Sequence, residues 1–135
     1  MIYKVVCPLY ITLPRKTKKD KKIYLNLNVN RNLHHAINNQ AKIVFKDFIM
    51  DQLILLPKFK GNIEVKYTVI KQDKRHFDLS NVACVIDKFL CDALVEAGKL
   101  VDDNTKYLKR VEYVYGGIDK NNGRCIVEIK EVCDD

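Results

Sequence analysis

Five aspartates gather in one segment of this basic chain, between positions 78 and 104. Carboxylates that are held close together repel one another and lose hydration unless a cation joins them. Oxygen ligands of this kind suit Mg²⁺ or Mn²⁺, whereas zinc is expected to recruit His or Cys. Such ions activate a water molecule and stabilise the leaving oxygen in phosphodiester cleavage. The segment therefore predicts a divalent-metal site, whose candidate ligands are Asp78, Asp87, Asp92, Asp102 and Asp103.

A helix has to position most of these carboxylates. Apolar residues recur at i, i+3, i+4 and i+7 spacing, which predicts a helix from Ser80 to about Ala97. Ser80 or Asp78 is expected as its N-cap and Gly98 as its C-terminal stop. The buried face of this helix is expected to consist of Val82, Val85, Ile86, Phe89, Leu90, Ala93 and Ala97.

The predicted helix also separates the carboxylates. Asp87 and Asp92 flank the apolar stripe about 140° apart, so they are not expected to hold one ion unaided. After the helix, the sequence KLVDDN returns Asp102 and Asp103 towards its C-terminal half. A helix of about 17 residues is roughly 25 Å long, so Asp78 and Asp103 need not meet within one subunit. Either the loops curl over the helix, or an adjacent strand brings the carboxylates together.

Lys88 lies four residues before Asp92 on the same face of this helix. The plain interpretation is an i, i+4 ion pair worth about 0.3 kcal/mol. The alternative is a charge that stabilises negative charge on a phosphate during cleavage. Both interpretations stay open.

Histidine and cysteine give no zinc site. His34 and His35 are expected at the surface or as helix caps, and His76 is close enough to Asp78 to be a minor candidate for substrate contact. Cys84 and Cys91 are expected to be half-buried small residues. The five cysteines form an odd set without a C-x-x-C pair, which favours reduced thiols in a cytosolic protein.

The charge of the chain favours polyanionic partners. Lys and Arg number 24 against 17 Asp and Glu, a formal net charge of +7, and nucleic acid is the first candidate. The run RKTKKDKK at positions 15–22 is either a solvated loop or an arm that lies on phosphates. The candidate DNA-binding residues are Arg15, Lys16, Lys18, Lys19, Lys21, Lys22, Arg31, Lys74 and Arg75, although Arg31 also suits a capping role.

The remaining segments predict one α+β domain over residues 1–135. Strands are expected at 2–13 and 62–70, and a short extended segment at 25–30. A first helix is expected from Leu33 to about Leu55, and YLKRVEYVYGG and CIVEIKEV are expected to pair as a hairpin. The expected fold is a small two-layer domain with a mixed sheet of about four to five strands and two main helices. The expected apolar face of the first helix is Leu33, Ile37, Ala41, Val44, Phe48 and Leu55.

No apolar run approaches the roughly 20 residues that a membrane span needs, and the N-terminal segment lacks the pattern of a signal peptide. We therefore expect a cytoplasmic protein without membrane association.

The ordered motifs resemble one protein family. The segment DLSN…DKFLCDALVEAGKLVDDN is similar to the signature of RusA-type Holliday-junction resolvases, which reads Asp-Leu-Asp-Asn, then Lys, Asp-Ala-Leu, Gly and a closing Asp-Asp pair. YITLP, LNLNVNRN and the first helix also resemble the start of these proteins, so the resemblance covers nearly the whole chain. It implies a homodimeric, Mg²⁺-dependent endonuclease of bacteriophages and prophages, which nicks four-way DNA junctions in the bacterial cytoplasm.

Carried over by position, the resemblance implies catalytic roles for Asp78, Lys88 and Asp103, with Asp92 and Asp102 among the acidic positions of the motif. Two departures stand out. Ser80 occupies the place of the second aspartate in Asp-Leu-Asp-Asn, and the stretch before the lysine is about four residues longer, which is about one helical turn. We expect Asp87 to supply the missing carboxylate.

The preferred prediction is a dimeric, metal-dependent, structure-selective endodeoxyribonuclease in which Asp78, Asp87 and Asp103 hold metal and Lys88 stabilises phosphate charge. A four-way junction offers symmetric target strands, which a two-fold dimer matches with two sites. The alternative is a non-catalytic module that binds DNA junctions, whose acids are caps and surface pairs. A third interpretation is a protein-binding adaptor that uses its basic face.

Overall fold

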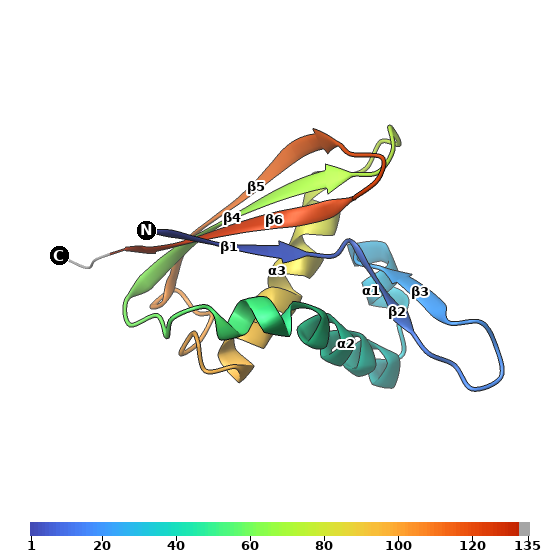
Figure 1. The fold of residues 1–135 in the computed structure, drawn as a ribbon, viewed down its shortest axis with the longest axis horizontal. Helices are drawn as coiled ribbons and strands as arrows, with labels where there is room; N and C mark the ends of the chain where they lie inside the picture. The colour runs from blue at the N-terminus through green and yellow to red at the C-terminus, as the bar shows by residue number, and fades with distance from the viewer. Residues whose placement is uncertain (133–135) are drawn as a thin grey trace.

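The computed structural model describes residues 1–132 and has an α+β fold, as predicted. Its main sheet has four strands: β1 (Ile2–Cys7), β4 (Asn62–Lys71), β5 (Leu108–Ile118) and β6 (Arg124–Val132). The spatial order is β1-β6-β4-β5, with β6 antiparallel to both neighbours and β4 parallel to β5 (Figure 1). The sheet is therefore mixed, as the sequence predicts.

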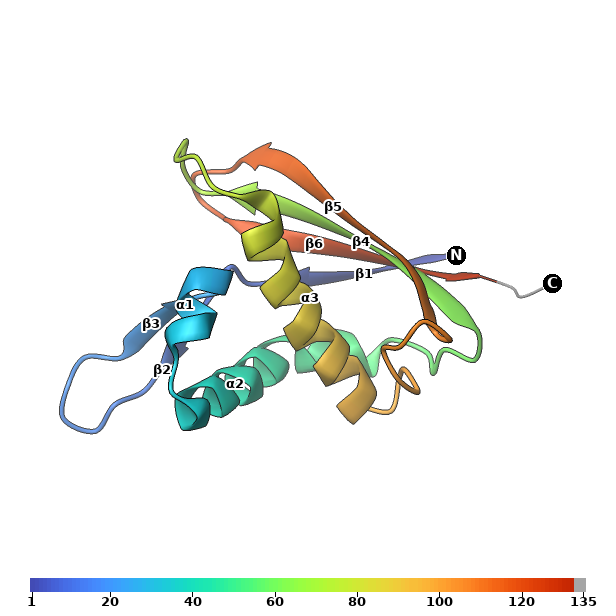
Figure 2. The ribbon, with the colours of Figure 1, turned by 180° about the vertical axis from the view of Figure 1, so that it is seen from behind.

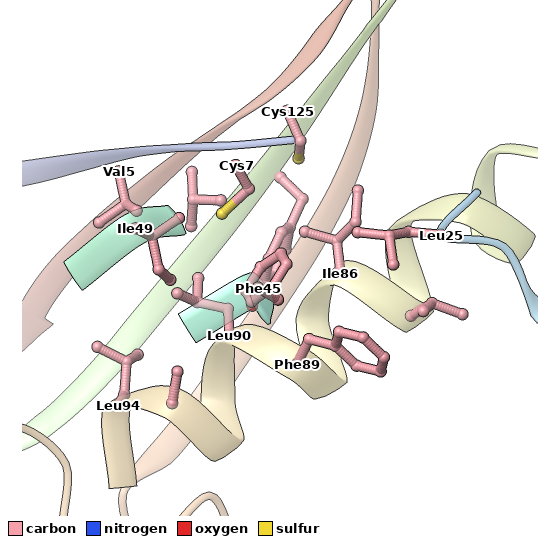
Figure 3. Packing of buried hydrophobic residues seen from close by; sticks show 14 of the residues in the cluster. Val5, Cys7, Leu25, Phe45, Ile49, Ile86, Phe89, Leu90, Leu94 and Cys125 are labelled. Atoms are coloured by element: carbon pink, nitrogen blue, oxygen red, sulfur yellow. The ribbon is translucent and has the colours of Figure 1, made fainter. Parts of the chain in front are cut away.

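Two long helices complete the second layer. Helix α2 (His35–Ile54) precedes β4, and α3 (Leu79–Glu96) is the crossover that connects the parallel strands β4 and β5. Figure 2 shows α3 in front of the sheet, whereas Figure 1 views the sheet from its other face. Phe45 of α2 and Phe89 of α3 pack edge to face with ring centroids 5.5 Å apart (Figure 3). This packing fixes α3 against α2, and with it the aspartates that α3 carries.

A small hairpin extends from one end of the molecule. It consists of β2 (Tyr10–Leu13) and β3 (Lys21–Tyr24), and residues 14–20 form the projecting loop between them (Figure 1). Ile11 and Ile23 are buried on the inner face of this hairpin. Because side chains alternate along a strand, Tyr10, Thr12, Lys22 and Tyr24 share the opposite face.

The segment that follows the hairpin corrects one prediction. Residues expected to be extended at 25–30 instead form a short helix, α1 (Leu27–Asn32). Asn26 begins it as N-cap, and its side-chain oxygen accepts a hydrogen bond of 2.9 Å from the Val29 amide. The alternation of Leu and Asn suggested a strand, but an asparagine at the N-cap position satisfies a free amide of the first turn and so favours the helix.

Two expectations about the strands differ from the structure. The expected strand at 2–13 is divided into β1 and β2, with Pro8 and Leu9 between them. The expected hairpin of β5 and β6 is wrong, because β4 lies between these strands and pairs with both. A short connection with turn residues indicated direct pairing, but the long-range pairing with β4 prevails.

The buried face of the first long helix was also wrongly predicted in part. The residues of α2 that are buried are Ala41, Phe45, Ile49 and Leu53, whereas Phe48 and Leu55 are 64% and 84% exposed. Apolar residues occur on two sides of this helix, so its periodicity alone did not identify the side that packs.

The uncovered face of the sheet carries alternating charges. Lys4, Glu128, Lys66 and Glu112 lie opposite one another in register across β1, β6, β4 and β5. Opposite charges at cross-strand positions stabilise a sheet and cancel its field. The positive excess of the chain therefore lies elsewhere. Within residues 1–132, no helix combines the length and apolar character that a membrane span requires.

Candidate functional site

The carboxylate of Asp87 accepts hydrogen bonds from three side chains. Its Oδ1 accepts a hydrogen bond of 2.8 Å from the Tyr67 hydroxyl, and its Oδ2 accepts one of 2.8 Å from the Tyr113 hydroxyl. The Cys91 thiol, one helical turn further along α3, donates to Oδ1 at 3.2 Å. The carboxylate is thus fixed in direction by three donors from α3, β4 and β5.

The two tyrosines are brought together by strand register. Tyr67 of β4 and Tyr113 of β5 lie opposite each other in the parallel pair, and their ring centroids are 5.7 Å apart. Tyr67 is fully buried, so its hydroxyl needs a partner, which Asp87 provides. The alternation of β4 indicates that Tyr67 points towards the helices, and this signal was available in the sequence although Tyr67 and Tyr113 were not predicted as part of the site.

Burial keeps the donors of this cluster protonated. It raises the pKa of Tyr67 well above its ordinary value, with further contributions from Cys91 and Asp87. Burial, followed by the hydrogen bond that Tyr113 donates to Asp87 and by the charge of Asp87, also raises the pKa of Tyr113. Burial and then the field of Asp87 raise the pKa of the Cys91 thiol. At neutral pH these groups therefore remain donors to Asp87 and do not act as bases or nucleophiles.

Asp103 lies close enough to Cys91 to affect its thiol electrostatically. Its negative field contributes to the raised pKa of Cys91, although less than burial and Asp87 do. The neighbouring Asp102 has a different role, because its Oδ1 accepts from the Asp103 amide at 2.8 Å and its Oδ2 from the Asn104 side chain at 3.0 Å. Gly98, with φ of 73°, ends the helix and lets the chain turn back. Asp102 thus shapes the loop that carries Asp103.

Asp78 occupies the N-cap position of α3, but its carboxylate makes no capping bond to the helix backbone. The side chain is exposed, and its Oδ2 accepts from the Asn81 side chain at 3.3 Å. It lines an open groove together with Asn26, Asn28, Lys71, His76 and others. A carboxylate in a groove next to a lysine and a histidine is available to a ligand.

Asp92 and Lys88 form ion pairs away from the Asp87 cluster. Asp92 Oδ2 lies 3.3 Å from Lys42 Nζ of α2, and its Oδ1 lies 3.8 Å from Lys88 Nζ. The i, i+4 pair is therefore present, and Lys42 is a partner that sequence reasoning did not predict. The Lys88 side chain remains 62% exposed. Asp92 links α3 to α2, so its contacts are those of a structural residue.

The candidate metal ligands do not converge as a set of three. Among residues 1–132, no three His, Cys, Asp or Glu side chains are placed to hold one ion. Asp78 and Asp87 are nine positions apart along α3, which corresponds to a rise of about 13.5 Å. The oxygen donors themselves suit Mg²⁺, which is commonly held by one or two carboxylates with waters and substrate phosphates. Asp87 and Asp103 both lie near Cys91, so they could supply these two carboxylates. This pair fits Mg²⁺ better than the three predicted ligands together do.

The predicted basic residues lie mainly at the hairpin end of the molecule. Arg15 Nε donates to the Lys19 carbonyl oxygen at 2.8 Å and so closes the projecting loop. Lys22 stacks over Tyr10, with its Nζ 3.9 Å from the ring centroid. Arg75 contacts Asp73 in the loop between β4 and α3. The other predicted DNA-binding residues, Lys16, Lys18, Lys21, Arg31 and Lys74, lie in or beside the hairpin, α1 and this loop.

The structure tests some of the predictions for histidine and cysteine. His34 is the N-cap residue of α2, and its Nδ1 accepts from the Ala36 amide at 3.2 Å, which confirms a capping role. Cys84 is half-buried and Cys91 is buried, and both are free thiols. Cys133 lies outside the described residues.

No protein-family model matches the chain, and no curated protein is significantly similar to it.

Proposed function

We propose that this protein is a homodimeric, Mg²⁺-dependent endodeoxyribonuclease that cleaves four-way DNA junctions. The observation that carries the proposal is the exposed carboxylate of Asp78 in an open groove lined by Lys71, His76 and asparagine side chains. Basic side chains let the groove attract a polyanion, and a carboxylate is the group through which a divalent ion is recruited beside phosphate. When bound, Mg²⁺ would activate the attacking water and stabilise the leaving oxygen.

The roles of the individual residues follow from their contacts. Asp87 and Asp103 would hold the ion, because Asp87 is fixed by two tyrosine hydroxyls and the Cys91 thiol and still has a lone pair on Oδ2 for a cation. Asp78 would recruit a separate divalent ion beside the phosphates of a strand that lies in the groove. The exposed ammonium of Lys88 would stabilise phosphate charge. In this proposal Asp87 supplies the carboxylate that Ser80 lacks.

Charge distribution supports an approach of DNA from the hairpin end. The open face of the sheet alternates Lys4, Glu128, Lys66 and Glu112, so its field largely cancels. The segment 15–22 carries basic side chains in the loop of the projecting hairpin and at the start of β3. We propose that these residues contact the phosphate backbone and position the junction without reading its sequence. A homodimer would present two such surfaces to the symmetric arms of a junction.

A cleavage assay tests this proposal. A synthetic mobile four-way junction with one labelled strand is incubated with the protein and either Mg²⁺ or a chelator. We expect symmetric nicks only with Mg²⁺, and loss of nicking in Asp87→Asn. Asp47→Asn, the same substitution at an exposed aspartate of α2, serves as the matched control and is expected to cleave normally. Full cleavage by Asp87→Asn would refute the role of Asp87, and absence of nicks by the wild type would refute the nuclease.

A non-catalytic junction-binding module is the second candidate. It is favoured by the hydrogen bonds that already occupy both oxygens of Asp87 and by the lack of a three-ligand group among residues 1–132. In the same assay, this candidate predicts a junction complex in gel-shift experiments but no nicks with either Mg²⁺ or Mn²⁺. A protein-binding adaptor would show neither junction preference nor a steep salt dependence of DNA binding.

A further inference from the structure

An open groove runs from the hairpin to the start of α3. Its first part has a volume of about 280 Å³ and is lined by Tyr10, Tyr24, Asn26, Lys71 and neighbouring residues. Its second part, of about 600 Å³, leads to Asp78. Asn26, Lys71 and Val82 line both parts, so the two parts adjoin. Each part approaches or falls within the size range of ligand sites in proteins.

The hairpin end of this groove presents an aromatic pair. Tyr10 and Tyr24 are directly opposite in the β2–β3 register, and their ring centroids are 5.9 Å apart. Lys22 Nζ lies 3.9 Å from the Tyr10 centroid and 5.0 Å from the Tyr24 centroid. Tyr24 remains 50% exposed, although Ile23 beside it is buried. The hairpin thus uses one face for the core and turns its two rings towards the groove, with the Lys22 ammonium held over them.

Exposed aromatic rings beside an ammonium group can distinguish unpaired from paired DNA. Bases stack on exposed aromatic rings irrespective of sequence, and neighbouring cations bind the phosphates of the same strand. In a duplex, the faces of the bases already stack on one another, so a tyrosine ring cannot use them. The groove also has amide side chains of Asn26 and Asn28 and the ammonium of Lys71 along its length. These groups can hydrogen-bond to base edges and phosphates.

We propose that this groove binds a short unpaired DNA strand, with one base stacked on Tyr24, its phosphates near Lys22 and Lys71, and its path directed to Asp78. The inference rests on the proposed function only for the identity of the polyanion as DNA. It gives a reason for selectivity towards branched DNA, because strands that leave a branch point are the ones whose bases can unpair. Tyr24 acts as a binding residue and takes no part in bond cleavage.

Fluorescence anisotropy tests the groove directly. Labelled oligo(dT), a blunt duplex of the same length and a four-way junction are titrated with protein in a chelator, so that no cleavage occurs. We expect Tyr24→Ala to bind oligo(dT) about tenfold more weakly, which is the usual contribution of one stacked base. Binding to the duplex should change less than about twofold, because the duplex cannot use the ring. Tyr24→Phe keeps the ring and should bind oligo(dT) like the wild type.

A lysine pair provides the matched charge control. Lys22→Ala should weaken oligo(dT) binding, whereas Lys106→Ala should not, although Lys106 also lies over a tyrosine ring, with its Nζ 5.5 Å from the Tyr107 centroid. If Tyr24→Ala and the wild type bind oligo(dT) equally, the proposed binding of an unpaired strand in the groove is overturned, while the nuclease proposal stays intact. An equal loss on duplex and oligo(dT) would also overturn it. Failure of the wild type to bind any of the three DNAs would overturn both proposals.

Discussion

Removal of one hydroxyl tests how Asp87 is held. Tyr67→Phe deletes the donor that lies 2.8 Å from Asp87 Oδ1 but keeps the ring that packs against Tyr113. A hydrogen bond to a charged group contributes about 1.5–3 kcal/mol to stability. Asp87 keeps Tyr113 and Cys91 as donors, so we expect the lower part of this range. The free energy of unfolding should therefore fall by about 1.5 kcal/mol.

Urea denaturation followed by far-UV circular dichroism measures this loss, since the chain contains no tryptophan. A double-mutant cycle with Asp87→Asn should give a coupling energy of about 1–2 kcal/mol, because the two side chains share one contact. Tyr24→Phe is the matched control, and removal of its exposed hydroxyl should change stability by less than about 0.5 kcal/mol. A Tyr67→Phe variant as stable as the wild type, or strictly additive effects in the cycle, would refute the proposed hydrogen bond.

The same variant should change the pH dependence of stability. Burial raises the pKa of Tyr67 and of Cys91 in the folded protein. The unfolded chain therefore loses these protons first as pH rises, beginning near the ordinary values of 9.0 for the thiol and 10.0 for the phenol. The contribution of Tyr67 and Cys91 to the free energy of unfolding is therefore complete below those pH values. Above them it declines by about 1.4 kcal/mol per pH unit for each group. Tyr67→Phe should have a shallower decline above pH 10 in urea titrations, and an unchanged slope would contradict the raised pKa.

Three further substitutions follow from the contacts. Asp78→Asn should lower junction nicking by at least about 100-fold. Its binding to DNA in chelator should stay equal or tighten, because the groove loses a negative charge. Weaker binding would contradict the placement of Asp78 in the DNA-binding groove. Asp92→Asn should reduce the free energy of unfolding by about 0.5 kcal/mol in urea and leave nicking intact, since its partners are partly exposed lysines; lost nicking would assign Asp92 to the metal. Replacement of Lys16, Lys18 and Lys19 by Gln should lower the salt slope of duplex binding by about 0.9 per lost phosphate contact, and an unchanged slope would show that the loop is only solvated.

The sequence predicted α3 and β4 closely because local signals mark their ends. The helix was expected from Ser80 to about Ala97 and is observed at Leu79–Glu96. Gly98 supplies the positive φ that ends it, and the apolar spacing identifies most of its buried face. These features depend on residues within one or two turns, so no knowledge of the tertiary structure was needed.

The arrangement around Asp87 could not be predicted in the same way. Its two tyrosine partners come from β4 and β5, and their alignment depends on a parallel pairing across the α3 crossover. The expected hairpin of β5 with β6 would have placed Tyr113 beside a different strand. Pairing between distant segments is decided by the whole sheet, whereas turn residues report only on their neighbours.

The length of α3 determines how its carboxylates can cooperate. Asp78 and Asp87 are separated by a rise of about 13.5 Å, whereas the ligand oxygens of Mg²⁺ lie only about 2.1 Å from the ion. One ion therefore cannot join the two side chains while α3 remains helical. An ion at Asp78 would instead complete its shell with waters and with phosphates of a strand in the groove. Binding of the ion and binding of the strand would therefore be coupled. An ion at Asp78 that requires those phosphates would strengthen binding of the strand, and by reciprocity the bound strand would strengthen binding of the ion.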